Sequence, residues 1–239
     1  MDYLAGLNPQ QRAAVENTQG PVMIVAGAGS GKTRVITYRV AHLIQKGVDP
    51  FNILVLTFTN KASKDMRERI SKVIGPEAKN IWMGTFHSVF AKILRFEGKH
   101  LGYTSDFSIY DTDDSKSLLK SIIKERGLDD KVYKPNVVFN RISGAKNRLI
   151  GPDEYLNNPI IQADDAAAKL PEIGRLYKLY TLRGFQANAM DFDDLLFNTN
   201  VLFRDHPVVL DKYQRKFQYI MVDEFQDTNV SQYLIIKKL

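Results

Sequence analysis

Short unbroken runs of apolar residues, each followed by polar residues, recur along the chain and predict the strands of a sheet. Three such runs occupy residues 22–25, 53–56 and 219–222, and strands buried on both faces have this composition. Residues 81–83 form another apolar segment with a polar end, and residues 107–110 are a weaker candidate strand. Because helical patterns lie between the runs, we expect an α/β fold in which a parallel sheet carries helices on both faces.

Amphipathic helical patterns follow the first two of these runs. The first pattern stops at Lys46-Gly47, a cation and a glycine as is common at helix ends, and its apolar residues are Ile36, Val40, Leu43 and Ile44. The second has four apolar residues on one face, namely Ala62, Met66, Ile70 and Val73, and basic residues around the rest. Residues 22–56 should therefore form a strand–helix–strand unit with a right-handed crossover. Before this unit, Asn8 can cap a helix that starts at Pro9.

The pattern changes between residues 112 and 190, where no strong strand signal occurs. Asp113 or Asp114 can open a helix that closes at Arg126-Gly127. A later amphipathic helix is marked by Leu170, Ile173, Leu176, Tyr177 and Tyr180. We therefore predict that residues 112–190 form a helical subdomain inserted into an α/β domain made of residues 1–111 and 191–239.

Composition and charge narrow the class of protein only slightly. Lys and Arg number 33 against 27 Asp and Glu, which suits an anionic partner, although an evenly solvated basic surface would give the same excess. The chain has no cysteine, which excludes disulfides, thiolate metal sites and cysteine nucleophiles and fits a reducing cytoplasm. The N-terminus has no secretion signal, and no uncharged stretch could span a bilayer, so we expect a cytoplasmic protein without a membrane partner.

Residues 26–33 have the composition of a phosphate-binding loop between a strand and a helix. Their order is Ala26, Gly27, Ala28, Gly29, Ser30, Gly31, Lys32 and Thr33. The three glycines let backbone N–H groups surround an anion, and the helix N-terminus adds partial positive charge. Lys32 would reach the β and γ phosphates, and the Thr33 hydroxyl would hold Mg²⁺. Ala26 departs from the strict pattern, which has glycine there, and an ordinary glycine-rich turn is the alternative.

Two strand ends carry polar residues together with an aromatic side chain. The first group is Thr57, Phe58, Thr59, Asn60, Lys61 and Ala62, and the second is Gly84, Thr85, Phe86, His87 and Ser88. Ligands of open parallel sheets bind at the carboxyl ends of the strands. Phe58 could stack on a nucleobase, and the alternative is a core aromatic beside a solvated amphipathic helix. His87 is a poor metal candidate, because no second ligand lies at a suitable spacing.

An acidic pair follows the last predicted strand. Asp223 at the strand tip suits Mg²⁺ bound through its waters. Glu224 could orient an attacking water and accept its proton. Acidic residues are also common as turns and helix caps, so the pair gains meaning only beside a phosphate loop. Gln11 is a further candidate, because an amide can read the adenine edge, although an exposed glutamine on a first helix would look the same.

In their order along the chain these blocks resemble the superfamily 1 DNA helicases of the UvrD/Rep/PcrA type. The matching blocks are Gln11, residues 26–33, residues 57–62, residues 84–88, residues 191–196 (Asp-Phe-Asp-Asp-Leu-Leu) and residues 223–227 (Asp-Glu-Phe-Gln-Asp). Alanine is common at the first position of the phosphate loop in this family. The resemblance covers essentially the whole chain.

The resemblance implies a RecA-like motor domain with ATP and Mg²⁺ as cofactors. It implies catalytic roles for Lys32, Asp223, Glu224 and Gln226, the last linking the γ phosphate to DNA-binding elements. It implies nucleotide contacts by Gln11, residues 26–33 and Arg34, and magnesium contacts by Thr33 and Asp223. It also implies DNA contacts by residues 57–61 and by Thr85, Phe86 and His87.

The same resemblance implies ATP-driven translocation in the 3′ to 5′ direction on single-stranded DNA, with junctions of single- and double-stranded DNA as substrates, in repair or replication restart. The family's second motor domain has no counterpart here, so we expect an N-terminal fragment that hydrolyses ATP hardly at all alone. Three alternatives stay open. They are the motor of a recombination helicase–nuclease, a nucleotide-dependent clamp that does not unwind nucleic acid, and a small-molecule kinase, which the acidic pair and the basic strand-tip helix argue against.

Overall fold

The computed structural model describes residues 3–27 and 29–239, and the chain divides into two compact units. Unit 1 comprises residues 1–89, 211–227 and 239, and unit 2 comprises residues 90–210 and 228–238. These units are defined by contacts between residues, whereas the predicted boundaries at 111/112 and 190/191 divide a motor domain from an inserted subdomain. That division therefore stays a prediction.

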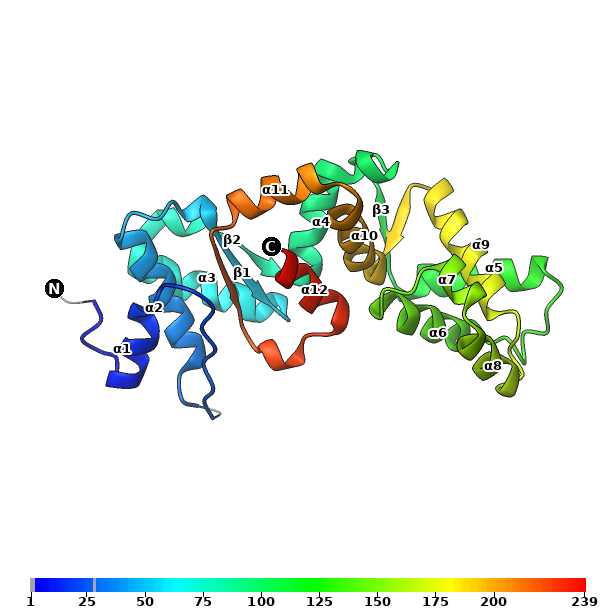
Figure 1. Ribbon diagram of the computed structural model, residues 1–239, viewed down its shortest axis with the longest axis horizontal. Helices are drawn as coiled ribbons and strands as arrows, with labels where there is room; N and C mark the ends of the chain where they lie inside the picture. Colours follow the sequence, from blue (N-terminus) through cyan, green and yellow to red (C-terminus); the bar gives the residue numbers. More distant parts are fainter. Residues whose placement is uncertain (1–2, 28) are drawn as a thin grey trace. The chain divides into compact units, whose positions relative to one another are not determined.

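Unit 1 is built on a parallel sheet of three strands in the order β2-β1-β5 (Figure 1). The strands are β1 (Ile53–Thr57), β2 (Trp82–Thr85) and β5 (Tyr219–Val222). Thr57 lies opposite Thr85, and Leu56 lies opposite Val222. The three strands therefore end at the same edge of the sheet, and the residues that follow them start from a common border.

The alternating side chains of β1 bury both faces of the sheet. Ile53 and Val55 join a core with residues of α2 (Lys32–Gln45) and α3 (Asn60–Ile74), among them Val40, Met66 and Ile70. Leu54 and Leu56 point to the other face and are also fully buried. The predicted parallel α/β sheet is confirmed, and the uninterrupted apolar run of β1 is explained by burial on both sides.

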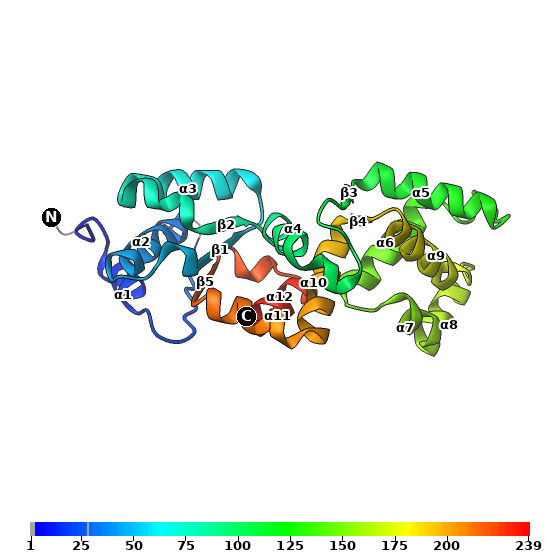
Figure 2. The ribbon, with the colours of Figure 1, turned by 90° about the horizontal axis from the view of Figure 1, so that it is seen from above.

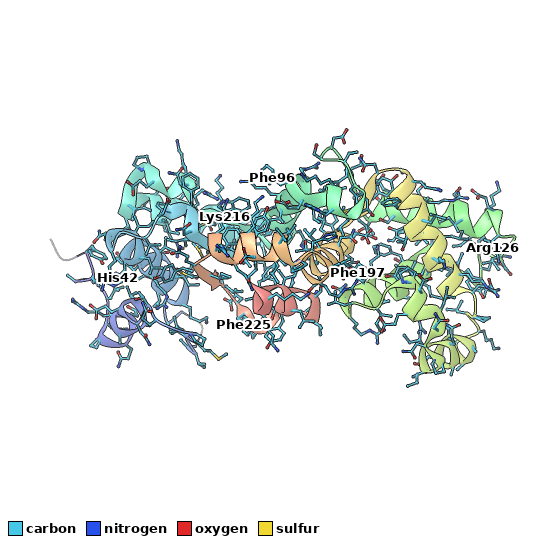
Figure 3. The ribbon with its side chains drawn as sticks, turned by 45° about the horizontal axis from the view of Figure 1, so that its top comes forward. His42, Phe96, Arg126, Phe197, Lys216 and Phe225 are labelled. Carbon is cyan, nitrogen blue, oxygen red and sulfur yellow. The ribbon has the colours of Figure 1, made fainter. Side chains whose placement is uncertain are left out.

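The ring of Trp82 packs beside this sheet in unit 1. It meets Phe217 edge to face, with ring centroids 5.3 Å apart, and the Lys216 ammonium lies 4.3 Å from its centroid. Lys216 ends α11 (Pro207–Lys216) and is labelled in Figure 3. The side chain is half-buried, so it belongs to the packing of the sheet margin.

Helix ends in unit 1 follow the signals in the sequence. Helix α1 (Pro9–Glu16) begins with Pro9, and Asn8 caps it by accepting a hydrogen bond from the Gln11 N–H, as predicted. Helix α2 ends at the cap Lys46, followed by Gly47 with φ of +89°. Three short 3₁₀ turns complete the connections: η1 (Pro50–Asn52), η2 (Gly75–Asn80) and η4 (Phe225–Asp227). Helix α4 (Phe86–Glu97), like α11, has residues in both units.

The prediction of a buried strand at residues 22–25 is wrong. Residues 21–27 form no strand, and Met23 and Val25 are 76% and 89% exposed. The predicted strand–helix–strand unit is therefore absent, and β5 is the edge strand next to β1. An apolar run becomes a strand only when a neighbouring strand pairs with its backbone, and the run itself does not specify that partner.

Unit 2 is mainly helical, as the sequence predicts for residues 112–190 (Figure 2). Its helices are α5 (Thr112–Glu125), α6 (Pro135–Asn147), α7 (Pro152–Asn157), α8 (Pro159–Ala167), α9 (Ile173–Gln186), α10 (Phe192–Asp205) and α12 (Val230–Lys238), with the 3₁₀ turn η3 (Gly98–Leu101). Its core gathers apolar residues of α5, α6 and α9, including Ile122, Val138 and Tyr177.

Two details of unit 2 differ from the sequence prediction. Asp111, and not Asp113 or Asp114, caps α5, since it accepts hydrogen bonds from the N–H groups of both later aspartates. The predicted strand at residues 107–110 forms as β3 (Ser108–Tyr110) and pairs in parallel with β4 (Ala189–Asp191). Strand β4 is three residues long, too short for its alternation to stand out in the sequence.

Candidate functional site

The glycine loop before α2 has the backbone that its sequence predicts. Gly29 and Gly31 have φ angles of +76° and +86°, a region that L-residues with side chains rarely adopt. Gly31 is the N-cap of α2, and the Ser30 hydroxyl donates to the Gly27 carbonyl at 2.7 Å. Ala28 lies outside the described residues. The loop thus leads directly into a helix N-terminus, where backbone N–H groups and the helix dipole favour an anion.

The side chain of Lys32 lies over this loop. Its ammonium donates to the carbonyls of Ala26 and Gly27 at 3.0 and 3.3 Å. Thr33 stands in the first turn of α2, where its carbonyl accepts from the Thr37 hydroxyl. Arg34 is exposed and donates to the Gly6 carbonyl at 2.8 Å, so it ties α2 to the segment before α1. Lys32 and Thr33 are therefore beside the loop, whereas the described contact of Arg34 is structural.

Gln11 connects α1 to the glycine loop. Its Nε2 donates to the Ser30 carbonyl at 2.9 Å, and its Oε1 accepts from the Asn8 N–H at 3.2 Å. A Cβ atom on Gly31 would stand 2.8 Å from the Gln11 Nε2. The glutamine therefore packs against the loop next to the predicted nucleotide contacts, at a residue whose φ of +86° favours glycine.

The acidic pair follows the end of β5. The Asp223 N–H donates to the Leu56 carbonyl at 3.0 Å, which extends the pairing of β5 with β1 by one residue. Glu224 has a φ of +50°, a strained value for a residue with a side chain, and its Oε2 accepts from the Gln226 Nε2 at 2.6 Å. Asp223 is buried, while Glu224 and Gln226 are exposed.

The electrostatic surroundings of Asp223 suit a cation. Burial and the neighbouring charge of Glu224 raise the pKa of the Asp223 carboxyl, and the charge of Lys32 acts in the opposite direction. A divalent cation held by oxygen ligands would stabilise the ionised form of this buried carboxylate. The Asp223 carboxylate and the Thr33 hydroxyl are oxygen donors of the kind that Mg²⁺ prefers, so they stay the candidate ligands. Among the described residues there is no cluster of three or more His, Asp or Glu side chains that could hold a metal alone.

The two polar strand ends predicted to face DNA lie next to each other. Thr57 ends β1 and Thr85 ends β2, and these residues are opposite each other in the parallel register. Thr59 caps α3, since its hydroxyl accepts from the Ala62 N–H at 3.0 Å. The Thr85 hydroxyl accepts in the same way from the Ser88 N–H at the start of α4. Two helix N-termini therefore begin at this edge, which suits contacts with phosphates.

Phe58 and Phe86 pack together at this edge. Their ring centroids are 5.4 Å apart, with Phe86 buried and Phe58 half-buried. Asn60 and Lys61 are exposed, and His87 is half-buried. Arg67, on the same helix as Lys61, donates to the carbonyls of Ala78 and Met83 and so binds the protein itself. One side of the Phe58 ring supports packing, and its partial exposure leaves surface for a ligand.

A buried ion cluster in unit 2 was not identified from the sequence. The Lys146 ammonium, in a side chain 1% exposed, lies 2.7 Å from carboxylate oxygens of both Asp191 and Asp194. The Tyr180 hydroxyl also donates to Asp191, at 2.8 Å. The resemblance flagged residues 191–196 without a role, and nothing in the spacing of Lys146 pointed to a buried lysine.

The pKa values of the two aspartates in this cluster are shifted in opposite directions. Burial and, to a smaller extent, the charge of Asp191 raise the pKa of Asp194 to about 7, against the opposing charge of Lys146. Burial would also raise the pKa of Asp191, but the charge of Lys146 and its hydrogen bond lower it overall. Two carboxylates that share one ammonium cannot both be fully compensated, so the proton goes to Asp194 first.

Comparison with known proteins gives one consistent result. Residues 7–239 match the protein family described as "UvrD/REP helicase N-terminal domain". The ATP-dependent DNA helicase PcrA of Bacillus subtilis is 46% identical over 237 residues, which is 99% of this chain and 31% of that protein. PcrA proteins of Staphylococcus epidermidis and Staphylococcus aureus are 44% and 43% identical over 98% of this chain.

The chain thus spans about 31% of the length of these curated relatives. No helix in the described part of the chain combines the length and apolar character needed to cross a bilayer. The family match covers nearly every residue, and it agrees with the parallel sheet, the glycine loop at a helix start and the order of the motifs. The chain therefore belongs to the UvrD/REP helicase N-terminal domain family.

Proposed function

We propose that this chain is the nucleotide-binding part of an ATP-dependent DNA helicase. In this proposal ATP binds at residues 26–33, with Gln11 beside the adenine and Arg34 near the loop. Single-stranded DNA contacts the ends of β1 and β2, through Thr57, Phe58, Thr59, Asn60 and Lys61 and through Thr85, Phe86 and His87. The relatives supply the activity class, since each is named an ATP-dependent DNA helicase.

One observation carries this proposal: the parallel register brings the ends of β2, β1 and β5 to one edge of the sheet. The acidic pair at β5 therefore starts from the same border as the proposed DNA contacts at β1 and β2. Lys32 acts electrostatically on Asp223, which relates the glycine loop to that border as well. A change at the nucleotide has a short route to the proposed DNA-binding residues in this arrangement.

Each candidate catalytic residue has a role that follows from its position. When ATP binds, the Lys32 ammonium would leave the carbonyls of Ala26 and Gly27 and donate to the β and γ phosphates. The new contact would be stronger, because its acceptor is charged. Glu224 would orient the attacking water and accept its proton, with Gln226 holding the carboxylate. Thr33 and Asp223 would hold Mg²⁺, which, when bound, neutralises charge on the phosphate oxygens.

The finer parts of the proposal rest on the family resemblance. They are 3′ to 5′ translocation, action at junctions of single- and double-stranded DNA, and a cytoplasmic role in repair or replication restart. The relatives are about three times as long as this chain, which supports a second motor domain as partner in the same reaction. An arginine brought to the phosphates by such a partner is typically worth about 10³–10⁵ in rate, so we propose slow hydrolysis by this chain alone.

The test is a titration of the purified chain with a fluorescent ATP analogue and Mg²⁺, comparing Lys32→Ala with Lys46→Ala. Lys46 lies at the other end of the same helix and serves as the matched control. We expect Lys32→Ala to weaken nucleotide binding by about tenfold or more, because a charge-assisted contact is lost, while single-stranded DNA binding persists. Equal affinity in both variants would remove Lys32 from the nucleotide site.

A further inference from the structure

One asparagine both caps a helix and holds a second helix in unit 2. Asn229 caps α12, because its Oδ1 accepts from the Gln232 N–H at 2.8 Å while its own N–H donates to the Gln232 Oε1 at 3.0 Å. Its Nδ2 then donates to the Oδ1 of Asn147 at 2.6 Å. The capping bonds would be complete without the amide nitrogen, so this last bond serves a different purpose.

Asn147 passes the contact on to a rigid part of unit 2. It is the last residue of α6, and its Nδ2 donates to Asp193 Oδ1 in the first turn of α10 at 2.9 Å. The preceding residue, Lys146, forms the buried ion pairs with Asp191 and Asp194. The end of α6 and the start of α10 are therefore joined by two adjacent residues, and Asn229 is attached to this junction.

The same asparagine follows closely after the candidate catalytic residues. Only Asp227 and Thr228 separate it from Gln226. Gln226 donates to Glu224, whose backbone lies in the left-handed region that a residue with a side chain rarely adopts. A phosphate oxygen or water bound by Gln226 would compete for the same amide hydrogens. Any resulting movement of residues 224–226 must be taken up within two residues or passed to the cap of α12.

We propose that Asn229 and Asn147 are positioning residues that transmit the state of the nucleotide site to the α6–α10 junction. This inference rests on the proposed nucleotide binding and adds a route to it. The hydrogen bond is the only side-chain bond from the cap of α12 to α6 among the described contacts. Breaking it should leave the ion cluster intact and α12 both capped and held to α10, since the Asn200 Nδ2 donates to the Ser231 carbonyl at 3.0 Å. It should therefore uncouple the end of α6 from events at Glu224 and Gln226.

The test is amide hydrogen exchange on the chain with and without a non-hydrolysable ATP analogue and Mg²⁺. In the unsubstituted chain, exchange in residues 142–149 at the end of α6 should change by about fivefold or more on nucleotide binding, the lower end of typical coupling between sites. In Asn229→Ser, which keeps a capping oxygen but lacks the amide donor, this change should disappear. Nucleotide affinity should stay within about threefold, because no proposed phosphate contact is altered.

Asn158→Ser is the matched control. Asn158 caps α8 by accepting from two backbone N–H groups, and it makes no described contact with α6 or α10. It should keep the nucleotide-dependent change, whereas Asn147→Ser and the double variant with Asn229→Ser should both resemble Asn229→Ser. A change that persists in Asn229→Ser, or that is absent from the unsubstituted chain with nucleotide bound, would overturn the inference. Failure to bind the analogue at all would instead refute the proposed function.

Discussion

The side chains of the candidate site are held by hydrogen bonds within the protein. Lys32 donates to loop carbonyls, Gln11 to Ser30 and Gln226 to Glu224. A ligand must replace these bonds, and a typical neutral hydrogen bond contributes only about 0.5–1.5 kcal/mol net. Binding by Lys32 therefore depends on the added strength of a charged partner, whereas Gln11 and Gln226 mainly determine where the neighbouring groups stand.

Phe58 is the residue for which packing and ligand binding make different predictions. If a base stacks on its exposed side, Phe58→Ala should weaken single-stranded DNA binding by about 1–3 kcal/mol. Fluorescence anisotropy with a labelled oligonucleotide measures this effect. Phe51, in η1 before the other end of β1, is a half-exposed phenylalanine and provides the control variant Phe51→Ala. If both variants bind DNA equally well, the role of Phe58 is to pack against Phe86.

Individual residues were predictable where the backbone imposes a chemical requirement. Gly29 and Gly31 stand at positive φ, and Asn8 is a helix cap, because few other residues satisfy those conditions. Lys146 was not predictable in the same way. A lysine in a helical pattern normally reaches solvent, and its burial depends on two aspartates that lie 45 and 48 positions later in the chain.

Among the elements, the ion cluster joining α6 and α10 should dominate the response of unit 2 to substitution. Lys146→Met would leave a buried carboxylate at Asp191 without its partner, at a cost of about 3–5 kcal/mol. Urea denaturation followed by circular dichroism measures this loss. The exposed pair of Lys178 and Asp153 in the same unit offers the comparison, because Lys178→Met should cost about 1 kcal/mol or less. Similar losses in the two variants would contradict a special role for burial.

Strands were predictable to the extent that the strands they pair with were implied by the sequence. The run that became β1 is flanked by β2 and β5, and all three were expected. Residues 22–25 have a similar composition but no backbone partner, and residues 189–191 became a strand because β3 pairs with them. Apolar periodicity reports which side chains can be buried, while strand formation also requires a backbone partner that periodicity cannot identify.

For the whole molecule, the raised pKa of Asp194 predicts that stability depends on pH. Its pKa rises from 3.8 to about 7 on folding, so the folded chain binds the proton more tightly than the unfolded chain. The free energy of unfolding should therefore fall as the pH rises from about 4 to about 7. Asp191, with a lowered pKa, contributes stability above about pH 4 that is lost as the pH falls further.

Thermal unfolding at a series of pH values tests this prediction. Asp194→Asn removes the titrating group and should flatten the decline between about pH 5 and pH 7, while the exposed control Asp153→Asn should not. An equal slope in Asp194→Asn and the unsubstituted chain would assign the decline to other groups.

Net charge predicts how DNA binding should respond to salt. The chain carries a formal charge of +6, and the exposed Lys61, Lys64 and Lys72 lie on the helix that starts at a proposed DNA contact. If lysines contact phosphates, the logarithm of the affinity should fall linearly with the logarithm of salt concentration, with a slope of about −0.7 per contact on a single strand. Lys61→Ala should make the measured slope shallower. A flat dependence would contradict a basic contact surface.

The packing around Trp82 gives unit 1 an optical signal of its own. This is the single tryptophan of the chain, and its ring is flanked by Phe217 and by the Lys216 ammonium. Unfolding of unit 1 separates these groups and exposes the indole, which shifts its emission to longer wavelength, whereas unfolding of unit 2 alters no tryptophan directly. Emission excited near the red edge of indole absorption therefore follows one unit alone. Circular dichroism follows the helices of both units, so a difference between the two midpoints would measure how independently the units unfold.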